Sequence, residues 1–451
     1  MTDSGSWARW KIPSRLRKRT KGERVAAKQW NLAPQGPLRG ELSIPGDKSV
    51  SHRSLLFGAL CEGESRVDGL LESGDVYATR GALAAMGVGF ETQGSTVTIS
   101  PPKSGLSHPH LPIDCGNSGT TMRLLSGLVA GQELHATLIG DHSLMQRPMA
   151  RVIGPLREMG VRISGSARDT LAPLTLSGGP PQAIRYQMPV ASAQLKSCLM
   201  LAGLKCGVSF REDRQSRDHT ERMLSSMGAT LHKDSEGWTH LAGGARLKGM
   251  HIHVPGDLSA AAFWLVAGAI TPGSFIRLPG VGMNPSRTGV LDALRAMGAD
   301  IRCTNERHFG EEPVADLEVR HSALTGVEIS GGLALRCLDE LPVLAVAAAH
   351  AEGQTTIRDA GELRHKESDR IRRVVQGLQA IDAKVEETED GMKILGNSPR
   401  GTGLIDAHGD HRIAMAFAVS ARAGATVRIQ GAQSVQSSYP LFLEHLEQLS
   451  G

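Results

Sequence analysis

Six polar segments along the chain each lead directly into a strongly apolar stretch. They begin at residues 46, 115, 191, 256, 339 and 409, and the stretches that follow are rich in alanine, leucine and other apolar residues. A helix that is apolar on all sides must be covered on nearly all sides. The pattern therefore predicts six buried helices, each of which begins at a polar loop.

A second motif, Leu-x-x-Met-Gly followed by valine or alanine, alternates with these stretches. It begins at residues 83, 156, 224 and 294, and a degenerate copy begins at 378. Each copy ends an amphipathic pattern of helical period, where the glycine suits the position after the helix and the methionine or isoleucine suits the core. A period of about 70 residues is typical of a repeated supersecondary unit.

Together the two patterns predict an α/β fold of six units between residues 38 and 445. Each unit holds a buried helix, a strand, an amphipathic helix and further strands. Two lobes of three units would bundle the buried helices inside and place the sheets outside. Pro-Gly-Asp recurs at 45–47 and 255–257, three units apart, and we expect the chain to cross between the lobes there, with a hinge at both crossings.

The expected domains are residues 38–46 plus 255–451 for one lobe, 47–254 for the other, and 1–37 for a disordered basic extension. Residues 1–30 carry nine Lys or Arg and two acidic residues, a net charge of +7. The whole chain carries +4, so the remainder carries −3. A mildly acidic body argues against nucleic acid as the main ligand, although a nucleic-acid tether through Arg15–Lys21 is an alternative.

Six cysteines, at positions 61, 115, 198, 206, 303 and 337, form no Cys-x-x-Cys motif, and no Cys/His cluster has zinc-ligand spacing. No apolar run approaches the roughly 18 residues that a membrane span needs. The N-terminus lacks the apolar core of a secretory signal. We therefore expect a cytoplasmic protein with reduced thiols, no metal and no membrane partner.

The segment at residues 44–60, IPGDKSVSHRSLLFGAL, places Lys48, Ser49 and Arg53 at the start of a predicted helix. A helix start already favours anions through its free N–H groups and its dipole. The related segment VPGDLS at 254–259 has Leu258 where the first has Lys48, so the turn itself does not need a lysine. Lys48 is interpreted as a ligand-binding residue, and a solvated surface charge is the alternative.

The other polar loops add more cations and a few carboxylates. If the helix starts converge on a cleft between the lobes, arginines and lysines would face each other with few acids, and the empty site would repel itself. Such a site suits a pair of small, highly anionic substrates, because arginine forks hold phosphate and carboxylate groups. Closure of the lobes over them would exclude water.

Eight motifs, PGDKSVSHR, GNSGTTMR, RPM, ASAQLKS, RDHTE, DELPVLA, KESDR and DHRIAMA, occur in the same order as in the EPSP synthase (3-phosphoshikimate 1-carboxyvinyltransferase) family of enolpyruvyl transferases, which the chain resembles over about residues 38–445. The resemblance implies two lobes of three βαβαββ units, an inside-out α/β barrel. It implies transfer of the enolpyruvyl group of phosphoenolpyruvate to the 5-hydroxyl of shikimate 3-phosphate. Phosphate leaves through a tetrahedral intermediate, without metal or organic cofactor, in the shikimate pathway to chorismate and the aromatic amino acids. A monomer that acts on small molecules is expected.

The same resemblance implies roles for the residues at matching positions. The expected ligands of shikimate 3-phosphate are Lys48, Ser49, Arg53, Ser192, Ala193, Gln194, Arg217, Asp339 and Lys366. The expected ligands of phosphoenolpyruvate are Lys48, Asn117, Gly119, Arg123, Arg147, Gln194, Arg370 and Arg412. Lys48, Asp339 and Glu367 are the expected catalytic residues.

The chemistry suits these three residue types. Asp339 would take the proton of the 5-hydroxyl, Lys48 would stabilise charge during attack, and Glu367, with a raised pKa in the closed site, would protonate the methylene carbon. An alternative for Glu367 is a plain ion pair with Arg370, three residues further along a helix.

Two positions depart from the family pattern. Ala193 stands where some members have a second serine, which removes one bond to phosphate. Gln436 and Ser437 stand where many members have a lysine before the C-terminal aromatic-Pro pair, so a cation is missing at that end of the phosphoenolpyruvate site. Glyphosate competes with phosphoenolpyruvate in this family, and Gly119 keeps the glycine that insensitive members often replace with alanine.

Other functions are weighed against this one. The arginine-rich motifs argue against enolpyruvyl transfer to UDP-N-acetylglucosamine. The acidic body argues against a nucleic-acid-binding or RNA-end-processing protein. The acids paired among the cations argue against a non-catalytic binding module. The segment DAHGDH at 406–411 could hold a metal, but capping a helix and orienting an arginine is the favoured interpretation. Cys115 could be a nucleophile, but a buried cysteine at a strand end is favoured.

Overall fold

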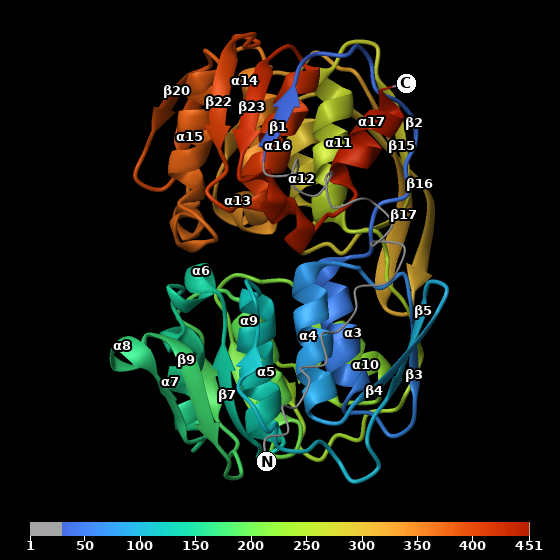
Figure 1. The fold of residues 1–451 in the computed structure, drawn as a ribbon, viewed down its shortest axis with the longest axis vertical. Coiled ribbons are helices and arrows are strands. Elements are labelled where there is room, and N and C mark those ends of the chain that lie inside the picture. The colour runs from blue at the N-terminus through green and yellow to red at the C-terminus, as the bar shows by residue number, and fades with distance from the viewer. Residues whose placement is uncertain (1–28, 451) are drawn as a thin grey trace, which may run out of the picture.

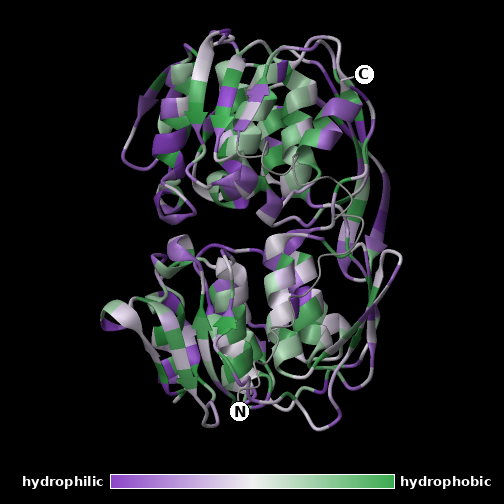
Figure 2. Ribbon diagram, viewed as in Figure 1, coloured by the Kyte–Doolittle hydropathy of each residue, from purple (hydrophilic) through white to green (hydrophobic). Residues whose placement is uncertain are grey.

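The computed structural model describes residues 29–450, which form two lobes stacked along the long axis of the molecule (Figure 1). Each lobe has its own hydrophobic core. The first core is built from residues between Val50 and Val254, and the second from residues between Leu258 and Leu449 together with Trp30, Leu38, Leu42 and Ile44. Apolar residues gather on the helices inside each lobe (Figure 2).

Six inner helices begin at the six polar loops that the sequence singled out, so the predicted repeat is confirmed. They are α3 (Lys48–Gly58), α5 (Gly119–Gly131) and α9 (Ala193–Gly203) in the first lobe, and α11 (Leu258–Ile270), α14 (Leu341–Ala349) and α16 (His411–Arg422) in the second. All nine residues of α14 are buried, as a helix that is apolar on every side requires. Within residues 29–450, no helix is both long and apolar enough to span a membrane.

Six small sheets surround these helices. The orders in the first lobe are β14-β3-β5-β4 (His251–His253, Ser65–Asp68, Thr96–Ser100, Gly89–Gln93), β6-β7-β9-β8 (Ile113–Asp114, His135–Ile139, Leu171–Ser177, Ile163–Gly165) and β10-β11-β13-β12 (Arg185–Gln187, Val208–Arg211, Thr239–Leu241, Leu231–Lys233). The orders in the second lobe are β16-β17-β15-β2 (Asp300–Phe309, Glu312–Arg320, Phe275–Gly282, Arg39–Glu41), β18-β19-β21-β20 (Glu328–Ile329, Gln354–Ile357, Met392–Leu395, Lys384–Glu387) and β1-β23-β22 (Gln29–Leu32, Thr426–Gln430, Thr402–Asp406). Every sheet has one parallel pair and otherwise antiparallel pairs, which is the signature of a repeated unit.

The amphipathic helices of the units are α4 (Gly74–Ala85), α7 (Ala150–Glu158), α10 (His219–Ser226), α12 (Gly289–Ala296) and α15 (Arg370–Ala380). Shorter elements are α6 (His142–Met145), α8 (Ser166–Asp169), α13 (Gly331–Arg336), η1 (Leu338–Glu340), η2 (Gly361–His365) and η3 (Ala432–Ser437), and α17 (Phe442–Leu449) ends the chain. The Leu-x-x-Met-Gly motif ends four of the amphipathic helices: Met297 is fully buried and Gly298 adopts a φ of +93°. In the degenerate copy Asp382 takes the same left-handed conformation, with a φ of +64°.

The two Pro-Gly-Asp segments lie side by side where the chain crosses between the lobes. The Asp47 N–H donates to the Pro255 carbonyl at 2.7 Å, and the Asp257 N–H donates to the Pro45 carbonyl at 2.9 Å. Each aspartate also caps its inner helix through its carboxylate, Asp47 at α3 and Asp257 at α11. The buried Arg287 lies against both carboxylates, so one cation joins the two crossings.

The boundary expected at residue 37 is wrong for residues 29–37, because β1 (Gln29–Leu32) pairs antiparallel with β23. Trp30 is buried and stacks on Phe442 with 6.0 Å between the ring centroids. Trp30 and Leu32 pack against the core while Asn31 between them is exposed, a period-two signal too short to stand out beside the basic stretch before it. The remainder of the expected extension, residues 1–28, lies outside the described residues.

Candidate active site between the lobes

A cleft between the lobes is walled by the polar loops that open the inner helices. All the residues that the sequence assigned to substrate or catalysis lie on its wall, except Asn117. Asn117 lies behind the wall, where its side chain accepts from Arg147 at 2.5 Å and donates to Asp141 at 2.6 Å. The free N–H groups of helix starts therefore face the same space as the side-chain cations, which makes the cleft suited to anions.

The expectation of few acids in the cleft is wrong. The wall also carries Asp75, Asp257, Glu362 and the predicted Asp339 and Glu367. Most of the cations are ion-paired across or along the cleft, so the ligand-free site does not repel itself. The sequence did not reveal this number of acids because Asp75 and Glu362 lie outside the polar loops, Asp257 was assigned to a crossing between the lobes, and Asp339 and Glu367 were interpreted as catalytic groups.

Lys48 opens α3 and forms an ion pair with Asp75 in the first turn of α4. Its backbone N–H donates to Asp257 at 3.3 Å, so the crossing segment holds the start of α3 from the other side. Asp75 was not predicted from the sequence. The signal that could have identified it is its place two residues after Ser73, in the first turn of a helix, where an acid is favoured.

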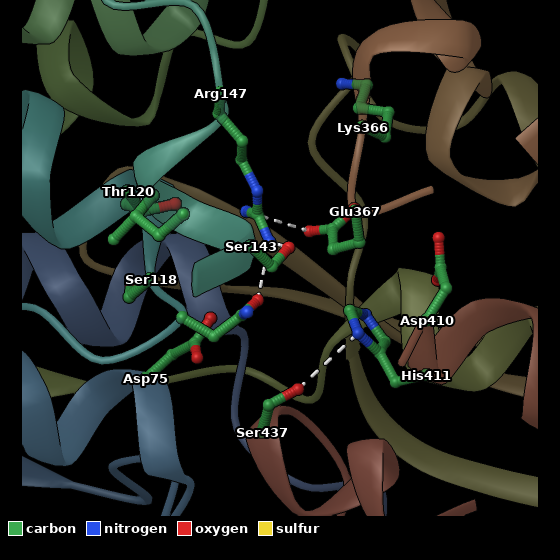
Figure 3. Close-up of polar contacts among 12 residues, drawn as sticks. Asp75, Ser118, Thr120, Ser143, Arg147, Lys366, Glu367, Asp410, His411 and Ser437 are labelled. Carbon is green, nitrogen blue, oxygen red and sulfur yellow. Dashed lines mark hydrogen bonds and ion pairs between the residues drawn. The ribbon is translucent and has the colours of Figure 1, made fainter. Parts of the chain in front are cut away.

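Arg123, Arg147 and Gln194 form one wall of the cleft near Gly119. Arg123 donates to the Gln194 side chain at 2.7 Å and to the Pro148 carbonyl at 3.0 Å, and burial lowers its pKa to about 10. Arg147 Nη1 reaches across the cleft to 3.6 Å from Glu367 Oε1 (Figure 3). A Cβ on Gly119 would lie 3.0 Å from Arg123 Nη1, so the glycine leaves room for both guanidinium groups.

Arg53 lies at the other end of the first-lobe wall and is almost fully buried. It donates to Thr220 Oγ1 at 2.6 Å and to Ser197 Oγ at 2.7 Å, and burial lowers its pKa to about 10. Ser192 accepts from the Leu195 N–H at 3.3 Å and so caps α9. The Ser49 carbonyl accepts from Arg53 at 3.0 Å, and Arg53 also reaches Ser197 of α9. The expected phosphate ligands of α3 and α9 are therefore near each other.

Lys196, which the sequence did not assign, supports this wall from behind. It is fully buried, and its Nζ lies 2.6 Å from Glu221 and 3.1 Å from Glu212. It also donates to the Ser216 carbonyl at 3.2 Å, one residue before Arg217. The apolar pattern of α9 gave no sign of this role, because the partners of Lys196 lie just after β11 and in α10, outside its own helix.

Asp339 lies at the centre of the second-lobe wall, in η1 just before α14. Arg217 Nη2 donates to it across the cleft at 2.5 Å, and Arg370 and Lys366 lie 3.2 and 3.6 Å away. Burial would raise the pKa of Asp339, but these cations, Lys366 foremost, hold it well below its usual range. Arg412 donates to the Asp339 carbonyl at 2.8 Å and to Ser259 at 2.6 Å.

Glu367 contacts Arg370 closely and lies near Arg147. Burial would raise the pKa of Glu367, but these arginines hold it well below its usual range. The raised pKa expected of a catalytic acid is therefore absent from the ligand-free site. The physical reason is the ion pair with Arg370, which the sequence analysis treated as the alternative to a catalytic role.

His411 follows Asp410 on the floor of the cleft, near Ser437 at 3.5 Å (Figure 3). Burial, followed by the nearby Lys48, holds the pKa of His411 well below its usual range, so the ring is neutral. Asp410 caps α16 through the Arg412 N–H and binds Arg370 Nε at 2.8 Å. These contacts agree with the favoured interpretation of the segment 406–411, a helix cap that orients an arginine.

Cys115 lies directly after β6 and is fully buried. Burial raises the pKa of its thiol to about 12. A thiol that stays protonated at neutral pH is a poor nucleophile, so the structural interpretation of this cysteine is the better one.

The family model described as EPSP synthase (3-phosphoshikimate 1-carboxyvinyltransferase) matches residues 32–446. The 3-phosphoshikimate 1-carboxyvinyltransferase of Citrifermentans bemidjiense is 47% identical over 422 residues, which are 93% of this chain and 98% of the relative. That of Alkalilimnicola ehrlichii is 49% identical over 422 residues, 92% of this chain and 94% of the relative.

Two solved structures are similar to this fold. EPSP synthase from Acinetobacter baumannii has a TM-score of 0.83 at 42% identity and covers 93% of this chain and 98% of its own. The enolpyruvyl transferase NikO from Streptomyces tendae has a TM-score of 0.74 at 17% identity, with 93% and 96% covered, and so shares the fold. Both likenesses extend over both lobes and the cleft between them.

Proposed function

The chain belongs to the EPSP synthase family, and from this premise we propose how its own residues carry out the reaction. The protein is a 3-phosphoshikimate 1-carboxyvinyltransferase (EC 2.5.1.19): it transfers the enolpyruvyl group of phosphoenolpyruvate to the 5-hydroxyl of shikimate 3-phosphate and releases phosphate. The observation that carries the assignment of roles is the cleft itself, where the predicted cations and two carboxylates from both lobes face one space.

The proposed domains are residues 38–46 plus 255–451, extended by residues 29–37 because β1 pairs with β23, and residues 47–254. The two separate hydrophobic cores support this division, since Leu38, Leu42 and Ile44 pack in the second-lobe core. The paired crossings at Pro45–Asp47 and Pro255–Asp257 supply the hinge. Closure about it would bring the two walls of the cleft onto the substrates and expel water.

The 3-phosphate of shikimate 3-phosphate would lie against Ser49, Arg53, Ser192 and Arg217. Arg53 supports this role because it is buried and pre-positioned by Thr220 and Ser197, so little side-chain freedom is lost on binding. Ala193 contributes its backbone at the start of α9, and Gln194 faces both substrates. Lys48, Asp339 and Lys366 would hold the hydroxyl groups of the ring.

Phosphoenolpyruvate would lie against the opposite end of the wall. Its proposed ligands are Lys48, Gly119, Arg123, Arg147, Gln194, Arg370 and Arg412, with Asn117 holding Arg147 from behind. The planar guanidinium groups suit the carboxylate and the phosphate of this substrate, because each can be bound by two parallel N–H groups. Gly119 lets the substrate approach the start of α5 and its free N–H groups.

The reaction needs a base and an acid at neighbouring atoms. In the addition step Asp339 takes the proton of the 5-hydroxyl, whose oxygen forms a bond to C2 of phosphoenolpyruvate, and Glu367 gives a proton to C3. In the elimination step a proton returns from the new methyl group to Glu367, and the C2–O bond to phosphate breaks. The proton held by Asp339 leaves with the phosphate, so both carboxyl groups return to their starting states. Lys48 stabilises the negative charge that develops between the two substrates.

Substrate binding would raise the pKa of Glu367, as a general acid requires. Arg370 and Arg147 hold its pKa low when the cleft contains no anion. The phosphate and carboxylate of bound phosphoenolpyruvate would neutralise these arginines, so the pKa of Glu367 would rise toward a value that suits a general acid. The low pKa of the ligand-free site and the acid role are thus compatible.

The proposed partners are the two small-molecule substrates, and neither nucleic acid nor a membrane is proposed as a partner. We propose that the protein is a monomer in the cytoplasm. The residues 29–450 include all six cysteines, and every one is a free thiol. That state suits a reducing compartment.

A continuous assay of phosphate release tests the function. The purified protein should release phosphate only when both phosphoenolpyruvate and shikimate 3-phosphate are present, and omission of either substrate is the control. Product analysis by mass spectrometry should show 5-enolpyruvylshikimate 3-phosphate. No release above background with both substrates would contradict the assignment.

A further inference from the structure

Two histidines and an aspartate converge on the outer face of the first lobe, away from the cleft. They are His251 and His253 of β14 and Asp68 of β3, and their ligand atoms all lie within 4.8 Å of one another. His251 Nε2 lies 2.7 Å and His253 Nδ1 3.2 Å from Asp68 Oδ2. Among the residues that the structure describes, this is the one group of three or more such side chains that converges in this way.

The convergence follows from the backbone. His251 and His253 are two residues apart on a strand, so their side chains leave the same face, while Ile252 between them points into the core. β14 pairs in parallel with β3, and the register places His253 beside Asp68. The three side chains would therefore stay on one face of the sheet whatever rotamers they adopt.

The aspartate is oriented for a ligand role. Thr96 on the next strand donates to Asp68 Oδ1 at 2.6 Å, which leaves Oδ2 turned toward both histidines. A hydrogen bond to the second oxygen of a ligating carboxylate is the kind of support that metal sites use to fix their ligands. Phe309, from the tip of β16 in the second lobe, lies with its ring 5.7 Å from the His253 ring and shields one side of the group.

We propose that Asp68, His251 and His253 bind a divalent transition-metal ion, for which zinc is the best-suited common candidate. Two imidazole nitrogens and one carboxylate oxygen form a ligand set that zinc accepts, with water at the remaining position. Ligand atoms about 2.1 Å from a tetrahedral zinc lie roughly 3.4 Å apart, so the distances of 2.7 and 3.2 Å to Asp68 need only a small opening, and the two histidine nitrogens lie within 4.8 Å of each other. This site lies outside the substrate cleft and takes no part in the proposed reaction.

The position of the group suggests what the ion would do. β14 is the edge strand of its sheet, pairs with β3 over three residues only, and leads directly into the crossing at 255–257. An ion held by one residue of β3 and two of β14 would fasten this edge strand to its neighbour. Because the ion binds the folded state and not the unfolded chain, it would raise the stability of the protein.

The chain contains a matched control. His232 and His240 stack with 4.7 Å between their ring centroids, and His240 Nε2 lies 2.9 Å from Asp234 Oδ2. The second ring nitrogen of His240 is engaged by Ser209 at 2.8 Å, and the three side chains do not form a converging group. Two histidines with an aspartate are thus present twice, and only one set has a ligand geometry.

Isothermal titration of the chelator-treated full-length protein, free of any histidine tag, with ZnCl₂ tests the proposal. The parent should bind one equivalent saturably, Asp68→Asn and His253→Ala should each weaken this binding by at least about tenfold, and His240→Ala should leave it unchanged. Zinc should also raise the melting temperature of the parent and of His240→Ala, but not of the two ligand variants. Circular dichroism without zinc checks that the variants fold.

Cobalt distinguishes this site from the free thiols. Bound Co²⁺ should show d–d absorption without a thiolate charge-transfer band, because the proposed ligands are nitrogen and oxygen. No saturable binding by the parent, equal binding by Asp68→Asn, or a thiolate band would each overturn the proposal. In that event the group is a surface pair of histidines bonded to a carboxylate.

Discussion

Arg217 of the first lobe donates to Asp339 of the second lobe at 2.5 Å, so a proposed phosphate ligand is ion-paired to the proposed catalytic base when the cleft contains no substrate. The pair spans the space that shikimate 3-phosphate would occupy. Binding of the phosphate would therefore draw Arg217 away from Asp339 and free the carboxylate to take a proton. Under the proposed roles, substrate binding and activation of the base would be one event.

The first prediction follows from that relationship. Asp339→Ala and Glu367→Ala should each lower kcat by at least about a hundredfold, the usual contribution of a general base or acid. Phosphate release at saturating substrates measures kcat, and circular dichroism checks the fold. Near-normal kcat in either variant would remove that residue from the mechanism. Asp369→Ala, which changes the half-buried helix cap two residues after Glu367, is a control that should retain turnover.

Lys48 gives the second prediction. Lys48→Met should keep the fold but lower kcat at least about a hundredfold, because Leu258 occupies the equivalent place in the second Pro-Gly-Asp segment and the helix there forms without a cation. The substitution leaves Asp75 without its partner, so the double variant Lys48→Met/Asp75→Asn separates the two effects. If Lys48→Met melts far below the parent and the double variant does not recover, Lys48 is structural.

The third prediction concerns the buried Lys196. Lys196→Met leaves the carboxylates of Glu212 and Glu221 without a cation in a buried place, which should cost about 3–5 kcal/mol of unfolding free energy. Urea denaturation followed by circular dichroism measures this loss. Lys205→Met is the matched control, because Lys205 pairs with Glu133 at 3.3 Å on the surface, where such pairs contribute about 1 kcal/mol or less. Equal effects of the two substitutions would contradict the structural role of Lys196.

The N-terminal segment gives the fourth prediction. Deletion of residues 1–28 should leave kcat unchanged, since no site motif lies there. Trp30→Ala should lower the unfolding free energy by about 3 kcal/mol, because its buried ring packs on Phe442. Asn31→Ala, an exposed position on the same strand, should change it by less than about 0.5 kcal/mol. Activity lost on deletion would show that residues 1–28 act on the cleft.

Some features of the fold and of the site can be recognised in a single sequence. The six inner helices could be predicted because the same change from polar to apolar residues recurs at each of them. This repeat reflects the packing of the fold and can be recognised without knowing the ligand. The asymmetry between Lys48 and Leu258 led to the prediction that Lys48 binds a ligand, and the structure places Lys48 on the wall of the cleft. Arg53, Arg217 and Asp339 were assigned by motif resemblance, and the cleft brings them together.

The residues that escaped prediction depend on contacts between distant segments. Asp75 is paired with Lys48 only because α4 packs on α3, and Lys196 of α9 meets Glu221 only because the fold brings the side chains of two separate helices together. Neither Asp75 nor Glu221 stands at a regular helical or strand spacing from its partner, so no pattern along the chain could indicate either ion pair. The same limit applies to part of the pKa shift of Glu367: burial opposes the shift and Arg370, three residues away, lowers the pKa most, but Arg147 adds to the lowering from the opposite lobe.

The last prediction concerns Gly119 and glyphosate, the anionic inhibitor that competes with phosphoenolpyruvate in this family. The parent should be sensitive, because Gly119 leaves space beside Arg123 and Arg147. Gly119→Ala would place a methyl group 3.0 Å from Arg123 Nη1, closer than most such contacts, and 3.5 Å from Arg147 Nη1, an ordinary contact, so the Arg123 guanidinium must shift slightly. The inhibition constant for glyphosate should then rise more than the KM for phosphoenolpyruvate, because glyphosate is the longer molecule and meets the methyl directly.

The missing lysine near Ser437 does not produce this discrimination. A lost cation weakens the binding of both anions, whereas a methyl group excludes only the ligand that needs its space. Gly154→Ala is the matched control: it adds a methyl in the exposed part of α7 with no atom within 4 Å, and both constants should stay unchanged. Competition kinetics on the parent and both variants decide the matter. A parent that already resists glyphosate, or equal losses for inhibitor and substrate in Gly119→Ala, would show that the pocket is shaped by a group other than Gly119.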